Sequence, residues 1–143
     1  VIEAYSVAFL RWHRGHRLRQ ELNSLLRTLN CEPKAQLQRT AGAQLRLVLS
    51  QIAVAERKRP GDREAVLGVM VQLAAAVDRR RAEIKKSANL DELADLPLRL
   101  VGLYLETRIA VARKQISLKD AEQMEGLMES ALLKSQVKSG CQT

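Results

Sequence analysis

The segment RWHRGHRLR, residues 11–19, concentrates side chains that can bind anions, because it holds four arginines, two histidines and one tryptophan. Guanidinium groups pair with phosphate through two hydrogen bonds, and tryptophan or histidine rings can stack on unpaired bases. We therefore interpret this segment as a candidate nucleic-acid contact made by Arg11, Trp12, His13, Arg14, His16, Arg17 and Arg19. The alternative is a solvated helix face with a buried tryptophan, because charged segments usually cover a protein surface.

Further basic side chains lie in two later segments that we expect to be helical. If three successive helices run up, down and up, counting residues back from each turn places Arg17 level with Arg46, and Arg79 near the level of residue 21. We call the resulting predicted surface the basic belt. Its members are Arg14, Arg17, Arg19, Arg39, Arg46, Arg79, Arg80 and Arg81. Six or more phosphate contacts would make binding fall about 10³-fold or more between roughly 50 and 200 mM salt.

The distribution of charge also predicts an anionic partner. The formal net charge is +8, and residues 1–90 hold 17 Lys and Arg against 8 Asp and Glu, whereas residues 91–143 hold 7 against 8. A surface of one sign raises the encounter rate with polyanions. The leading hypothesis is therefore an accessory or regulatory module that binds DNA or RNA through phosphates. The rival is an interaction domain whose basic surface meets an acidic protein or an anionic membrane.

Other chemistry has weaker support in the sequence. His13 and His16 have the spacing of helical metal ligands, but no acidic residue or cysteine lies within one turn of them, and zinc needs at least three protein ligands. Acidic groups occur at Asp91, Glu92 and Asp95 and at Glu122, Glu125 and Glu129, and we interpret both as solvated surfaces. Because no nucleophile, phosphate-loop or dinucleotide motif occurs, we predict a protein that is not an enzyme and binds no metal or cofactor.

The elements that position these residues are predicted to be helices. The chain has 7 glycines and 3 prolines, and no hairpin signal separates alternating apolar residues. Apolar spacing predicts helices over 2–29 and 34–58, a third after an Asp62 cap, a fourth over 98–115 and a fifth from residue 118 after a Ser117 cap. We expect an all-α fold, a four- to five-helix, mostly antiparallel bundle forming one domain over residues 1–143.

Three local patterns predict details of the packing. The fourth segment is apolar around much of its circumference, which is typical of a helix at the centre of a bundle. Gly15 interrupts the apolar stripe of the first segment, so either the helix kinks or another backbone packs closely there. Met124, Leu127, Met128 and Leu132 in the C-terminal helix are interpreted as core, with a protein contact or self-association as the alternative.

The length of the apolar runs and the number of cysteines indicate where in the cell the protein functions. The longest nearly apolar run, residues 65–77, is interrupted by Gln72 and falls short of the ~20 residues that cross a bilayer. Two cysteines, Cys31 and Cys141, favour a reducing compartment, so we expect an intracellular, cytoplasmic protein with no disulfide framework. The N-terminal stretch does not resemble a signal peptide, and because residue 1 is valine we expect that the chain can be part of a longer protein.

Overall fold

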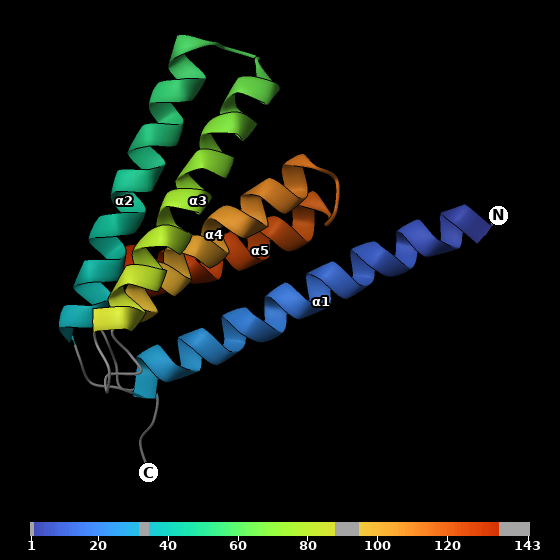
Figure 1. Cartoon of the computed structure of the whole chain (residues 1–143). Helices are drawn as coiled ribbons and strands as arrows, with labels where there is room; N and C mark the ends of the chain where they lie inside the picture. Colours follow the sequence, from blue (N-terminus) through green and yellow to red (C-terminus); the bar gives the residue numbers. More distant parts are fainter. Residues whose placement is uncertain (1, 32–34, 88–94, 135–143) are drawn as a thin grey trace.

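The chain folds into an all-α bundle (Figure 1). The computed structural model describes residues 2–31, 35–87 and 95–134, and side chains over 13–29, 39–86 and 95–132. Within these ranges there are five α-helices and no strand. The helices are α1 (Ile2–Cys31), α2 (Ala35–Lys58), α3 (Arg63–Ser87), α4 (Leu96–Ala112) and α5 (Leu118–Glu129), which continues into a π-helical turn (Ser130–Lys134).

Local sequence signals determine where the helices begin. The Asp62 carboxylate accepts a hydrogen bond from the Ala65 backbone N–H at 3.0 Å, and this cap starts α3 directly after Gly61, whose φ is +79°. The Ser117 hydroxyl accepts a hydrogen bond from the Asp120 backbone N–H at 3.1 Å and caps α5. Both predicted caps are confirmed. α4 begins two residues earlier than predicted because Pro97 is compatible with the first turn of a helix.

Helix α4 is the centre of the bundle. It contacts α1, α2, α3 and α5, and the predicted central position is therefore confirmed. Eleven of its residues are buried, and Leu100, Leu105 and Ala110 have no exposed surface. A helix surrounded in this way needs apolar side chains on nearly every face, which is what its sequence provides.

Helix α1 lies on a different side of α4 from the α2–α3 hairpin. It makes its main contacts with α4 and α5, whereas α2 and α3 pack on each other and on α4. Figure 1 shows that the C-terminal end of α1 lies near one end of the hairpin and that the two then diverge. The helix continues through Gly15, where a side-chain Cβ would lie 3.8 Å from Ile116 Cγ2. A side chain therefore fills this position, rather than the kink or the close backbone that the sequence suggested.

The C-terminal helix mainly contributes to the core. Met124, Met128 and Leu132 are buried, which confirms the core interpretation for these residues, whereas Leu127 is 52% exposed. No helix in the described part of the chain combines the length and the apolar character needed to cross a membrane.

Candidate nucleic-acid interface

The arrangement that defined the basic belt is not formed. The prediction placed Arg17 level with Arg46 because consecutive helices were taken to be neighbours. In the structure α1 packs mainly on α4 and α5, and it diverges from α2 (Figure 1). The candidate arginines of α1 and those of the α2–α3 hairpin therefore do not line one level of a regular bundle.

Three belt arginines form ion pairs that join helices. Arg14 of α1 contacts Glu106 of α4 at 2.8 Å, and Arg19 of α1 pairs with Asp120 of α5. Arg81 Nε of α3 lies 3.4 Å from Asp95 Oδ2 at the start of α4. These guanidinium groups neutralise carboxylates across helix contacts. We assign them to the assembly of the fold, although the Arg19 side chain is 45% exposed.

The other candidates have different positions. Arg17, Arg39, Arg46, Arg79 and Arg80 are exposed, and among the described residues none of them forms an ion pair. His13 and His16 are exposed on α1. Arg11 and Trp12 lie within α1, and the structure describes their backbone but not their side chains. Of the belt arginines that form no ion pair among the described residues, one therefore lies on α1 and four lie on the hairpin.

The free end of the α2–α3 hairpin adds cations that the sequence analysis missed. Arg57, Lys58 and Arg59 are exposed at the end of α2, and Arg63 is exposed at the start of α3. Of the four, Arg59 has an ion-pair partner among the described residues, Asp62, at 3.8 Å. Counting charge by helix would have found this cluster. Basic residues in the last turn of α2 also interact favourably with the helix dipole, so the sequence analysis explained them by this structural role and did not consider them for binding.

The balance of charge differs strongly between parts of the bundle. Residues 35–87, the α2–α3 hairpin, hold 11 Lys and Arg against 5 Asp and Glu, a balance of +6. Residues 95–134 hold 6 against 6, a balance of zero. The hairpin therefore carries most of the excess positive charge, and we call its exposed Lys and Arg side chains the hairpin cations. They are Arg39, Arg46, Arg57, Lys58, Arg59, Arg63, Arg79, Arg80, Lys85 and Lys86.

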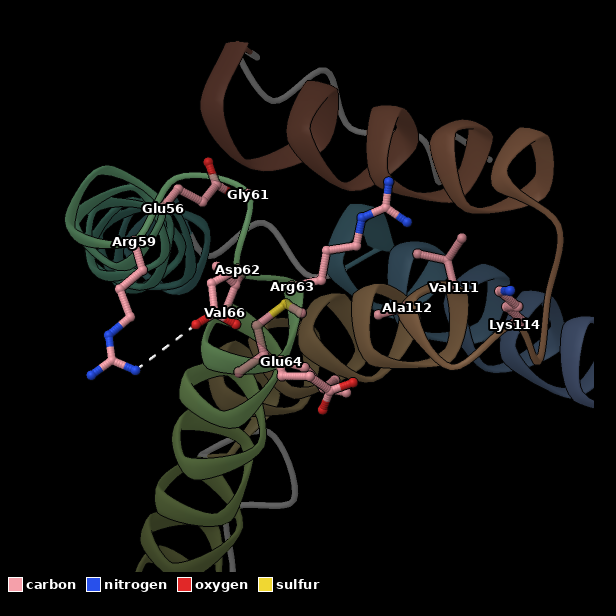
Figure 2. Close-up of a pocket in the computed structure, with 12 residues that line it drawn as sticks. Glu56, Arg59, Gly61, Asp62, Arg63, Glu64, Val66, Val111, Ala112 and Lys114 are labelled. Carbon is pink, nitrogen blue, oxygen red and sulfur yellow. Dashed lines mark ion pairs between the residues drawn. The ribbon is translucent and has the colours of Figure 1, made fainter.

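A pocket of about 550 Å³ lies between the hairpin turn and the C-terminal end of α4. Figure 2 shows Arg63 extending toward α5, while Arg59 extends the opposite way, beside Asp62. Val66 and Met70 of α3 contribute apolar surface to the lining.

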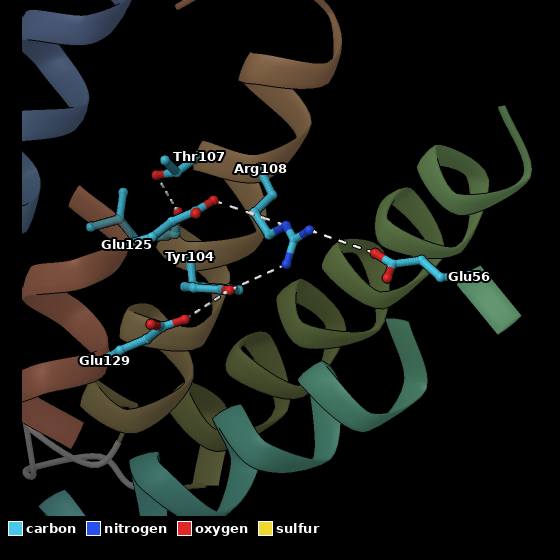
Figure 3. Close-up of polar contacts among 7 residues, drawn as sticks. Glu56, Tyr104, Thr107, Arg108, Glu125 and Glu129 are labelled. Carbon is cyan, nitrogen blue, oxygen red and sulfur yellow. Dashed lines mark hydrogen bonds and ion pairs between the residues drawn. The ribbon is translucent and has the colours of Figure 1, made fainter. Parts of the chain in front are cut away.

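A second polar cluster joins three helices on the neutral side of the bundle (Figure 3). Arg108 of α4 lies 3.8 Å from Glu56 of α2 and 3.9 Å from Glu125 of α5. The Tyr104 hydroxyl accepts a hydrogen bond from Arg108 at 3.3 Å and donates one to Glu129 at 3.3 Å. Burial raises the pKa of Tyr104, which keeps the phenol protonated.

The carboxylates of this cluster correct the interpretation of α5 as a solvated acidic face. Glu122 is exposed, but the Glu125 side chain is only 21% exposed and faces Arg108. Burial raises the pKa of Glu125, and the nearby Glu129 and Glu122 carboxylates add to this, while Arg108 lowers it. Asp95, expected on a solvated acidic linker, is also buried, beside Arg81; Asp91 and Glu92 lie outside the described residues.

Comparison with known proteins leaves the structure as the basis for functional inference. No protein-family model, curated protein or solved structure matches this chain. The class that the fold defines is an all-α helical bundle, in which residues 95–134 are neutral and the α2–α3 hairpin is basic.

Proposed function

We propose that this chain is a non-enzymatic module that binds nucleic acid, DNA or RNA, through phosphate contacts made by the hairpin cations. The observation that carries the proposal is the balance of +6 on residues 35–87, beside a balance of zero on residues 95–134. Arginine and lysine side chains that neutralise phosphates release condensed counterions, which drives binding without reading sequence.

The exposed positions of the hairpin support a contact with several phosphates. Arg63 and Arg79 lie 16 residues apart on α3, which at 1.5 Å per residue is about 24 Å along the helix axis. At 3.6 residues per turn the two arginines also lie about 160° apart around α3, so the cations of this helix can contact phosphates on more than one side of it. We exclude Arg14, Arg19 and Arg81 from the proposed contacts because each neutralises a carboxylate within the fold. Lys85 lies 3.9 Å from Asp95, but it stays among the hairpin cations because its side chain is 65% exposed. The exposed Arg17, on α1, remains an additional candidate.

A salt titration tests the proposal. Fluorescence anisotropy would follow binding of a DNA duplex of about 30 base pairs, and of a single-stranded RNA of about 30 nucleotides, at several salt concentrations. Each phosphate contact contributes about 0.9 to the slope of log affinity against log salt for duplex DNA. The double variants Arg57→Gln with Lys58→Gln, and Arg79→Gln with Arg80→Gln, should each reduce the slope by about 2.

The control variant removes the same charge from the neutral side. Arg113→Gln with Lys119→Gln alters two exposed cations near the ends of α4 and α5 and should reduce the slope by less than about 1. Equal slopes for the hairpin and control variants would overturn the proposal, as would binding that does not respond to salt.

An acidic protein or an anionic membrane would meet the same hairpin cations, and Leu47 favours a protein partner because it is 60% exposed beside Arg46. Polyglutamate and vesicles containing anionic lipid can be added as competitors at equal concentrations of negative charge. The nucleic-acid proposal requires that DNA or RNA bind at least about tenfold more tightly than either competitor. If nucleic acid binds less tightly than this, the hairpin cations are assigned instead to binding an acidic protein or an anionic membrane.

A further inference from the structure

The pocket at the hairpin turn has the size of a small-molecule site. Its volume of about 550 Å³ falls within the range of about 300–1,000 Å³ in which proteins hold such ligands. Val66, Met70 and Val111 provide apolar surface from α3 and α4. The pocket therefore offers cover for an apolar body and a charged rim for a polar group.

The carboxylates of the rim are largely engaged by partners of their own. Asp62 caps α3 through the Ala65 N–H and lies 3.8 Å from Arg59. Glu56 lies 3.8 Å from Arg108. Glu64, in the first turn of α3, is the remaining acidic residue of the lining.

Two cations of the rim have no ion-pair partner in the described part of the chain. They are Arg63 and Lys114, and they outnumber the remaining carboxylate of Glu64. Figure 2 shows Arg63 rising from the start of α3 toward α5, with Lys114 at the end of α4 on the same pocket's lining. An anionic group between them would receive a charge-assisted hydrogen bond from each side.

The backbone conformation of Lys114 is unfavourable for a residue with a side chain, so lysine at this position destabilises the fold. Its φ is +59°, in the left-handed region. The Lys114 N–H donates to Val111 O at 3.0 Å and the Gln115 N–H donates to Ala110 O at 2.8 Å, which is the Schellman end of a helix. Glycine is favoured at this position because it has no Cβ to oppose a positive φ. Helix termination alone would be better served by glycine than by lysine.

We propose that this pocket binds a small organic anion with an apolar body. Arg63 and Lys114 pair with its anionic group, and Val66, Met70 and Val111 cover the apolar part. The site shares Arg63 with the proposed nucleic-acid contact, and Lys114 distinguishes the two proposals. Removing Lys114 should leave the salt slope for duplex DNA unchanged, whereas loss of one phosphate contact would lower it by about 0.9, because Lys114 is not a hairpin cation.

A matched pair of fluorescent probes tests this proposal. 8-Anilinonaphthalene-1-sulfonate carries the aromatic body with a sulfonate, and N-phenyl-1-naphthylamine carries the same body without it. We expect one molecule of the sulfonate probe per chain, bound about tenfold more tightly than the neutral probe. Lys114→Gly should weaken the sulfonate probe about tenfold, because a charge-assisted hydrogen bond is lost, and leave the neutral probe unchanged.

The same variant should raise thermal stability. Relief of the left-handed lysine should increase Tm by about 3 °C, measured by circular dichroism. A loss of affinity together with a gain of stability separates a binding role from a structural one. Arg63→Gln provides an independent test and should also weaken the sulfonate probe about tenfold. The control, Lys119→Gln on α5, should bind both probes as the original chain does.

Two results would overturn the proposal. One is that Lys114→Gly and Arg63→Gln both bind the sulfonate probe with unchanged affinity. The other is that the original chain binds the charged and neutral probes equally well. The nucleic-acid proposal would survive either result, because its test measures the salt slope of the hairpin variants.

Discussion

The α4–α5 part of the bundle and the α2–α3 hairpin hold similar numbers of carboxylates but use their cations differently. Residues 95–134 have 6 acidic and 6 basic residues, and residues 35–87 have 5 acidic and 11 basic residues. Carboxylates of the first region pair with arginines of α1, α3 and α4, namely Arg14, Arg19, Arg81 and Arg108. The larger number of basic residues on the hairpin and the positions of the paired carboxylates therefore together determine which surface stays positive.

The sharpest test of this contrast is a leucine truncation in each region. Leu105→Ala in α4 should lower the free energy of unfolding by about 3 kcal/mol, because Leu105 is fully buried and its loss leaves a cavity. Leu47→Ala on the exposed face of α2 should change it by no more than about 0.5 kcal/mol. Urea denaturation followed by circular dichroism measures both. Similar losses at the two sites would show that α4 is not the centre of the core.

The junction between the two regions should give the next largest effect. Asp95→Asn removes the charge of a buried carboxylate beside Arg81 and should cost about 2 kcal/mol of unfolding free energy. Asp78→Asn is the matched control, because the Asp78 side chain is 74% exposed and lies 3.9 Å from the same arginine. We expect the control to cost less than about 0.5 kcal/mol in urea denaturation. A larger cost for Asp78→Asn than for Asp95→Asn would mean that Arg81 is held mainly by Asp78 and not by Asp95.

Glycine replacements compare the contact of α1 with the open face of α3. Gly15→Ala should increase the unfolding free energy by about 0.7 kcal/mol, because alanine favours helix and its Cβ meets Ile116 at an ordinary contact distance. Gly68→Ala on α3, where nothing lies within 4 Å of the added Cβ, should give a similar gain. Thermal melts of both variants check this. A loss at Gly15 alone would mean that α1 lies closer to Ile116 than the structure places it.

The smallest expected effect is a dependence on pH from Glu125. Burial raises its folded pKa above the usual value of 4.5, so the folded chain holds this proton after the unfolded chain releases it. Its contribution to stability is therefore full below pH 4.5 and is lost as the pH rises through the folded pKa. Glu125→Gln removes this decline, so the variant should gain stability relative to the original chain as the pH rises above 4.5. Glu122→Gln, on the exposed side of α5, should show no such gain in urea denaturation at each pH.

Local features of the fold could be predicted from the sequence, because they depend on neighbouring residues. The Asp62 and Ser117 caps and the apolar circumference of α4 each act within one or a few helical turns. The predicted helix limits consequently agree with the structure to within a few residues.

The candidate site was predicted less well, because it depends on contacts between distant residues. Arg14 and Glu106 are 92 positions apart, and Arg19 and Asp120 are 101 apart, so their pairing follows from helix order and rotation. Neither property can be obtained from periodicity alone. The exposed cations of the hairpin could have been recognised from charge per helix, whereas the left-handed backbone of Lys114 has no signal in its residue type.

The docking of α1 onto α4 and α5 has a consequence for how the chain matures. During synthesis, the leucines of α1 emerge well before residues 96–129, which cover them. Contacts separated by so many residues close large loops, which slows folding and leaves apolar surface available to chaperones in the interval. During translation, the apolar face of α1 therefore stays exposed until α4 and α5 have been synthesised.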